Sequence, residues 1–105
     1  MSVKHWKLQR LSAIILIPIV LFTLAYLSNL TSISYEMLLI DLGSYSGFVI
    51  GTLFFGFIIF HSSMGLEVII EDYVHSENLQ NNIISISKLL HIISFFVTVI
   101  ILASI

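Results

Sequence analysis

The stretch from His61 to Tyr73 carries side chains capable of chemistry. The imidazole of His61 can ligate a metal ion or carry a proton, and Asp72 and Tyr73 add a carboxylate and a phenol eleven and twelve residues later. In a helix, which rises 1.5 Å per residue, His61 would lie about 16 Å from Asp72. The spacing predicts a histidine deep in the molecule and a polar pair at its surface.

The element that holds His61 is predicted to be a membrane-spanning helix. Residues 43–66 include no Asp, Glu, Lys or Arg, and this run is long enough to cross a bilayer. Glu67, Glu71 and Asp72 follow it and are expected on the water side. His61 would then lie near the midplane of a hydrocarbon layer about 30 Å thick. An ionisable residue at that depth is costly unless something binds it, so His61 is the first candidate for a functional site.

The composition indicates an integral membrane protein. Of the 105 residues, 58% are hydrophobic and 10% are charged, whereas an average soluble domain has about 25% charged residues. The length allows three membrane crossings and leaves no room for a soluble catalytic domain, so any large chemistry must involve a partner protein. The chain has no cysteine, which excludes thiolate metal sites and iron–sulfur ligation within this chain.

We predict an all-α membrane protein with a single domain, residues 1–105, and three transmembrane helices. The helices are expected at about residues 11–34, 47–70 and 83–105. The polar residues 31–46 are expected to form a short loop on the outer side, and Asn81 or Asn82 could cap the third helix. A cleaved signal peptide is the alternative for the first segment, but its apolar run is longer than a typical signal sequence.

The positive charges predict the orientation of the chain. All the Lys and Arg residues fall on the face shared by the N-terminus and the second loop: Lys4, Lys7, Arg10 and Lys88. Loops on the inner side of a membrane are enriched in Lys and Arg, so an N-in/C-out topology is predicted. The acidic second loop gives this inner face both signs of charge. It is either a docking surface for a soluble subunit or an ordinary solvated loop.

Small residues share the face of the second helix that carries His61. At 100° per residue, Phe54 lies about 20° from His61, and three glycines lie within about 80° of it: Gly47, Gly51 and Gly65. Gly47 and Gly51 by themselves favour plain packing against another helix. With a midplane histidine on the same face, two interpretations of His61 stay open. It is an axial ligand of haem iron, or a buried histidine held by hydrogen bonds.

The other histidines are weaker candidates for a ligand. His5 lies in the basic N-terminal segment and His75 in the inner loop, and both are expected to be solvated. His91 is predicted eight residues into the third helix, about 12 Å deep. It is the rival ligand to His61.

The stretch around His61 also matches a known pattern. His61 and Gly65 precede the sequence VIIEDYVH, which contains the pair Asp72 and Tyr73. Arg10 stands shortly before a Ser-Ala-Ile segment. With three spans and an inner N-terminus, these features resemble the smaller membrane-anchor subunit of succinate dehydrogenase, respiratory complex II. The resemblance covers essentially the whole chain.

The resemblance implies a division of labour between subunits. A flavoprotein subunit oxidises succinate, an iron–sulfur subunit carries electrons, and two small anchors hold a haem b and reduce ubiquinone. His61 would be one axial haem ligand, and the second anchor, the cytochrome b subunit, would supply the other. Arg10 would lie near the haem propionates, Tyr73 would hydrogen-bond a ubiquinone carbonyl, and Asp72 would support the proton supply. Other carboxylates lie near Asp72, so its role rests on the motif.

Several alternatives stay open from the sequence. The chain could be a structural or regulatory three-helix protein without haem, in which His61 is only a packing contact. An ion-conducting pore is disfavoured because His61 and His91 are the only ionisable residues expected at depth. The anchor of a quinol:fumarate reductase is a further alternative. The absence of a presequence favours a bacterial inner membrane, with a mitochondrial inner membrane as the second choice.

Overall fold

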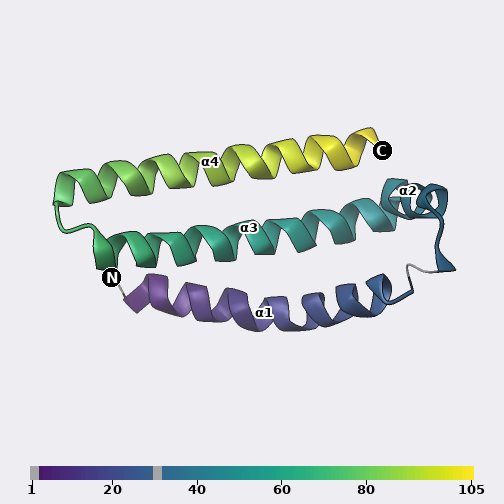
Figure 1. Ribbon diagram of the computed structural model, residues 1–105, viewed down its shortest axis with the longest axis horizontal. Coiled ribbons are helices and arrows are strands. Elements are labelled where there is room, and N and C mark those ends of the chain that lie inside the picture. The colour runs from purple at the N-terminus through teal and green to yellow at the C-terminus, as the bar shows by residue number, and fades with distance from the viewer. Residues whose placement is uncertain (1–2, 30–31) are drawn as a thin grey trace.

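The computed structural model describes residues 3–29 and 32–105, which form a layer of three long helices and one short helix (Figure 1). The helices are α1 (Val3–Leu27), α2 (Tyr35–Gly43), α3 (Tyr45–Tyr73) and α4 (Glu77–Ser104). α1, α3 and α4 contain the three segments long and apolar enough to cross a membrane. The predictions of an all-helical fold and three candidate spans are confirmed.

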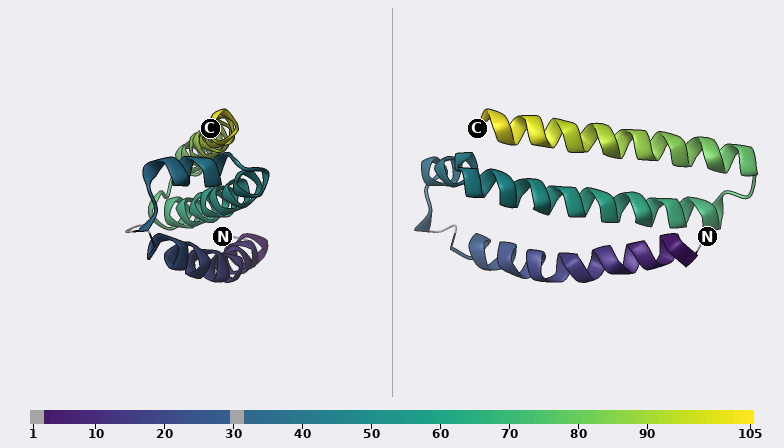
Figure 2. Two further views of the ribbon diagram at one scale, coloured as in Figure 1. Left: turned by 90° about the vertical axis from the view of Figure 1, so that its right-hand side faces the viewer. Right: turned by 180° about the vertical axis from the view of Figure 1, so that it is seen from behind.

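The long helices run antiparallel, and α3 lies between α1 and α4, with contacts to both (Figures 1 and 2). The start of α1, the end of α3 and the start of α4 lie together, at what we call the N-terminal end of the molecule. α2 and the C-terminus lie at the opposite end, where α2 packs against α3 and α4. The longest dimension is 51 Å. It exceeds a hydrocarbon layer of about 30 Å, so both ends can reach water.

The limits of α1 differ from those of the predicted first span. The helix begins at Val3, not near residue 11, and ends at Leu27, not near residue 34. Hydropathy marks where an apolar run begins, but the helix starts about two turns earlier, in the basic segment. Lys, Arg and Gln have good helix propensity, and long basic side chains can extend from such positions toward water. The helix continues through Pro18. Leu30 and Thr31, in the predicted span, lie outside the described residues.

α4 begins at Glu77, not near residue 83, so the prediction that Asn81 or Asn82 caps it is wrong. The cap is Ser76, whose hydroxyl accepts a hydrogen bond from the Leu79 N–H at 3.5 Å. Glu77 places a negative charge in the first turn, where it interacts favourably with the helix dipole. Residues of α4 therefore lie about 9 Å further along the helix than predicted.

A short helix, α2, occupies much of the predicted loop of residues 31–46. Its cap is Ser34, whose hydroxyl accepts a hydrogen bond from a backbone N–H three residues later at 3.2 Å. Tyr26 of α1 donates a hydrogen bond to the Asp41 carboxylate at 2.8 Å, which ties α2 to α1. Gly47 is required where α3 begins, because a Cβ there would overlap the carbonyl oxygen of Asp41. The prediction of a loop at residues 31–46 is therefore wrong over residues 35–43, which form a helix with well-defined caps.

The layer of helices has very little core of its own. Within residues 3–29 and 32–105, the buried hydrophobic side chains are Met64 and Leu102. Gly51 packs against Leu102 of α4, as the helix-packing interpretation of this glycine predicts. Large apolar side chains on all three long helices are exposed. Helices that are apolar all round need lipid or another protein around them.

Candidate functional site

His61 lies two residues past the middle of α3. Its Nδ1 is 2.9 Å from the hydroxyl oxygen of Ser12 in α1, and that hydroxyl donates a hydrogen bond to the Gln9 carbonyl oxygen at 2.7 Å. Ser12 is only 2% exposed. The Nε2 of His61 makes no hydrogen bond within the described part of the chain. One ring nitrogen is therefore held by α1, and the other is available to a ligand.

The imidazole of His61 also lines an apolar groove between α1 and α3, which we call the α1–α3 groove. The groove has a volume of about 300 Å³, and its other lining residues are aliphatic side chains of α1: Ala13, Leu16, Ile17, Val20 and Leu21. Mostly apolar walls with one well-placed polar group are typical of cofactor sites. The two interpretations of His61 left open by the sequence are compatible, since one ring nitrogen is hydrogen-bonded while the other has no hydrogen-bond partner among the described residues.

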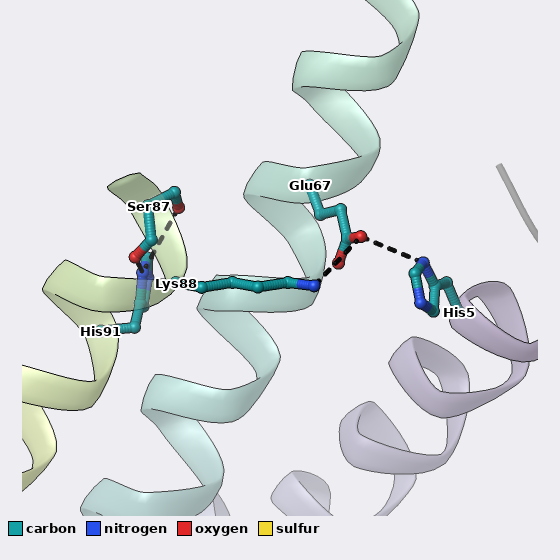
Figure 3. Close-up of polar contacts among 5 residues, drawn as sticks. All are labelled: His5, Glu67, Ser87, Lys88 and His91. Carbon is teal, nitrogen blue, oxygen red and sulfur yellow. Dashed lines mark hydrogen bonds and ion pairs between the residues drawn. The ribbon is translucent and has the colours of Figure 1, made fainter. Parts of the chain in front are cut away.

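His91, the rival ligand, lies near the middle of α4 and therefore at a similar depth to His61. Its Nδ1 is 2.7 Å from the Ser87 carbonyl oxygen, and its Nε2 is 3.0 Å from the Ser62 hydroxyl. Figure 3 shows the ring turned toward Ser87 of its own helix. His91 was predicted about eight residues into the third helix, but α4 begins at Glu77 and His91 lies near its middle, so position along the helix does not separate the two histidines. Their hydrogen bonds do, because both ring nitrogens of His91 are engaged.

A second groove, between α3 and α4, is lined by His91 and Lys88 beside mostly apolar side chains. Its volume is about 350 Å³, slightly larger than that of the α1–α3 groove. Neither of these two side chains is available to a ligand as His61 is, because His91 is bound by two serines and Lys88 pairs with Glu67. The α1–α3 groove is the stronger candidate for a ligand site.

Arg10 is exposed on α1, and its guanidinium carbon lies 5.4 Å from the centre of the Trp6 ring, a cation–π contact. Arg10 precedes Ala13 by three residues and Ile17 by seven, so the three residues share one face of the helix. Ala13 and Ile17 line the α1–α3 groove. Arg10 is therefore placed at the edge of the groove that faces the N-terminal end of the molecule.

Asp72 and Tyr73 form the end of α3, at the N-terminal end of the molecule. Both side chains are exposed, Tyr73 by 79%. The helix stops here because Val74 takes an extended conformation, while its N–H still bonds the Ile70 carbonyl oxygen. Along α3 the pair lies about 16–18 Å from His61. The structure thus separates a deep histidine from an exposed polar pair, as the spacing predicts.

Glu67, which the sequence led us to expect on the water side, is a buried carboxylate that is 5% exposed. Its Oε1 lies 3.2 Å from Nδ1 of His5 and 3.6 Å from Nζ of Lys88, so it links α1, α3 and α4 (Figure 3). His5 was expected to be solvated, and that prediction is wrong because the ring is half-buried. Ligand atoms of His5, Glu67 and Glu71 lie within 4.8 Å of one another. The Lys88 ammonium already supplies a positive charge to this group.

Comparison with known proteins identifies the family. The family model for the succinate dehydrogenase/fumarate reductase transmembrane subunit matches residues 1–102. The chain belongs to this family. No solved structure matches this succinate dehydrogenase/fumarate reductase transmembrane subunit.

Two curated relatives of this transmembrane subunit come from different organisms. It is 29% identical over 98 residues to the succinate dehydrogenase hydrophobic membrane anchor subunit of Rickettsia prowazekii (strain Madrid E). The aligned region covers 90% of this chain and 78% of that protein. It is 37% identical over 80 residues to the succinate dehydrogenase membrane anchor subunit of Reclinomonas americana. This aligned region covers 70% of this chain and 63% of that protein. The chain thus spans a little under two thirds of the second relative.

As a succinate dehydrogenase/fumarate reductase transmembrane subunit, the chain is a multi-pass membrane protein and one component of a larger complex. The family predicted from the sequence motif is confirmed. The motif residues fall into two groups, His61 and Arg10 beside the α1–α3 groove, and Asp72 and Tyr73 at the N-terminal end. The motif gave no role to Ser12, although its Ser-Ala-Ile segment includes this residue.

Proposed function

We propose that this family member is the membrane anchor of a succinate:quinone oxidoreductase, that it holds one side of a b-type haem, and that it helps to form the ubiquinone-reduction site. The observation that carries the proposal is the state of His61. Its Nδ1 is held by Ser12, and its Nε2 has no hydrogen-bond partner among the described residues. The ring lines the apolar α1–α3 groove. A neutral imidazole nitrogen is a common axial ligand of haem iron.

The residues around the α1–α3 groove fit a b-type haem. Aliphatic walls exclude water from the face of the macrocycle, and Arg10 at the groove edge can form charge-assisted hydrogen bonds with a propionate. At the depth of the groove, residues 3–29 and 32–105 offer one available imidazole, that of His61, since both nitrogens of His91 are engaged. The second axial ligand is therefore assigned to the second anchor, the cytochrome b subunit. When bound, the haem supplies a one-electron carrier within the membrane.

The ubiquinone site is assigned to the end of α3. The Tyr73 hydroxyl is exposed there and can donate a hydrogen bond to a quinone carbonyl, which stabilises negative charge as the quinone is reduced. Asp72 is exposed beside it and can pass protons from water toward the same oxygen. Both groups lie where a lipid-soluble headgroup could meet a soluble electron-carrying subunit.

The partners follow from this arrangement. An iron–sulfur subunit and, beyond it, a flavoprotein subunit are expected to dock at the N-terminal end of the molecule, near Tyr73. The chain is expected to have an N-in/C-out topology, because its four Lys and Arg residues gather toward that end. We place the complex in a bacterial inner membrane, with a mitochondrial inner membrane as the alternative.

A quinol:fumarate reductase anchor is the second candidate function. The family model that matches the chain covers both succinate dehydrogenase and fumarate reductase subunits. The names of both relatives favour succinate oxidation. A three-helix protein without haem would be the alternative if His61 proved to have no ligand.

The test of the proposal is the haem spectrum of the assembled complex. His61→Ala removes one of two axial ligands and is expected to abolish or alter the low-spin b-haem spectrum. His91→Ala, a matched control at similar depth, should leave the spectrum unchanged. A normal spectrum in the His61→Ala complex would contradict the ligand assignment. A spectral change in the His91→Ala complex would indicate that both ligands come from this chain.

A further inference from the structure

The hydrogen bonds of Ser12 determine which nitrogen of His61 carries the proton. A serine hydroxyl has one proton, and that of Ser12 is donated to the Gln9 carbonyl oxygen at 2.7 Å. At the 2.9 Å contact with His61, the Ser12 oxygen can therefore only accept. The Nδ1 of His61 must carry the hydrogen, and Nε2 is left with its lone pair.

We infer that Ser12 is a positioning residue for His61: its buried hydroxyl holds the imidazole in the Nδ1–H tautomer and presents Nε2 as the ligand nitrogen beside the α1–α3 groove. This inference rests on the proposed haem-binding function and adds to it the residue that prepares the ligand. A ligating histidine is usually oriented by a partner on its second ring nitrogen, which fixes the tautomer and raises the basicity of the ligand.

His91, at a similar depth in α4, has the same tautomer as His61 but a hydrogen-bonded Nε2. The Nδ1 of His91 is 2.7 Å from the Ser87 carbonyl oxygen, which can only accept, so this nitrogen carries the hydrogen. The Nε2 of His91 then accepts from the Ser62 hydroxyl at 3.0 Å. Ser62 follows His61 directly in α3, so two serine–histidine pairs lie at the same level of the molecule. Ser62 occupies Nε2 of His91 with a hydrogen bond, whereas Ser12 bonds Nδ1 of His61 and leaves its Nε2 open to a ligand.

Because Ser12 is buried, water cannot easily replace its hydrogen bond with His61. Ser12 is 2% exposed, so little water reaches the contact to replace the serine oxygen. Without that oxygen, the Nδ1–H of His61 would be left in apolar surroundings with no acceptor, which is unfavourable. The population of the tautomer with the hydrogen on Nε2 would then increase, and this tautomer cannot ligate iron through Nε2. The serine oxygen also favours the oxidised haem, because a more basic imidazole stabilises the higher charge on iron.

The experiment compares four variants in the intact, purified complex: Ser12→Ala, Ser12→Thr, Ser62→Ala and His61→Ala. The measurements are the haem midpoint potential and the low-spin electron paramagnetic resonance spectrum. In Ser12→Ala, we expect the potential to shift in the positive direction, by up to about tenfold in the oxidised-to-reduced ratio, which is about 59 mV for one electron. Ser12→Thr keeps a hydroxyl that can bond the same carbonyl oxygen and should stay close to wild type.

Ser62→Ala is the control, because it removes an exposed serine–histidine contact at the same level of the molecule and leaves the Ser12–His61 contact in place. It should leave the potential and the spectrum unchanged. Loss of haem from Ser12→Ala but not from Ser12→Thr would also support the inference, since only the hydroxyl differs in chemical role.

Three results would overturn the positioning role. The first is a wild-type potential and spectrum in Ser12→Ala, the second is an equal effect in Ser62→Ala, and the third is equal haem loss in Ser12→Ala and Ser12→Thr. His61→Ala tests the underlying proposal separately. If that variant kept a normal haem spectrum, the ligand assignment itself would fail, whatever the serine variants show.

Discussion

At the scale of single residues, the Tyr73 hydroxyl is the hydrogen-bond donor that the proposed quinone site takes from this chain. Tyr73→Phe keeps the ring and removes the donor. Losing a preorganised hydrogen bond to developing charge costs about 2.7–4 kcal/mol, and the 79% exposure of Tyr73 argues for a smaller loss. We expect quinone reduction by the purified complex to fall at least about tenfold, which corresponds to about 1.4 kcal/mol.

The same Tyr73→Phe complex should oxidise succinate normally with a soluble dye and should keep its haem spectrum. Tyr45→Phe provides a matched control, because Tyr45 is an exposed tyrosine at the opposite end of α3. Loss of the Tyr45 hydroxyl should not affect quinone reduction. Wild-type quinone reduction in the Tyr73→Phe complex would exclude Tyr73 as a quinone contact and leave the Asp72 and Tyr73 pair as part of a docking surface.

Sequence reasoning about residues succeeds where one helix decides the outcome. The depth of His61 and the surface position of Tyr73 follow from the rise of a single helix. The roles of Ser12 and Glu67 depend instead on how different helices meet. Ser12 contacts a residue 49 positions away, and Glu67 is buried only because α1 and α4 bring His5 and Lys88 to it. In the sequence, the position of Lys88 within an apolar helix is the feature that could have predicted a buried carboxylate opposite it.

At the scale of elements, Glu67 joins the three long helices near the N-terminal end. Lys88→Met removes a full positive charge from this junction and leaves the Glu67 carboxylate 5% exposed beside His5. Removing one partner of a buried ion pair costs about 3–5 kcal/mol. Because the Lys88 side chain is 46% exposed, we expect a smaller loss. It should appear as a lower melting temperature of the purified complex.

A double variant separates the buried charge from general packing. Glu67→Gln combined with Lys88→Met removes both charges of the ion pair and should recover most of the lost stability. Lys7→Met, which removes an exposed lysine of α1, should have almost no effect. If the double variant were as unstable as Lys88→Met alone, the packing of the Lys88 side chain, and not its charge, would hold α4 to α3.

The elements themselves were predicted more reliably than their limits. Hydropathy identifies the three long helices because each must present apolar side chains to a bilayer. It does not locate the ends, which depend on caps such as Ser76 and on basic residues that continue a helix into the interface. α2 was missed for the same reason. Its stability comes from the Ser34 cap and from the contact between Tyr26 and Asp41, and neither is visible in a hydropathy profile.

At the scale of the whole molecule, the helices form a layer in which α3 alone contacts both long neighbours (Figure 2). Such a layer leaves the apolar side chains on its faces exposed. The α1–α3 groove opens onto this exposed surface, so a haem held by His61 would remain uncovered on one side by this chain. This geometry is the physical reason for assigning the second axial ligand to another anchor subunit.

The orientation of the molecule in the membrane can be tested with reporters fused to its two ends. The basic residues near the start of α1 predict that the N-terminal end lies inside, and three spans then place the C-terminus outside. Alkaline phosphatase fused after Ile105, which is active only outside, should therefore be active. The same reporter inserted in the connection between α3 and α4, at His75, should be inactive. Reporters that give the same result at both positions would contradict a membrane crossing by α4, and reversed results would contradict the positive-inside assignment.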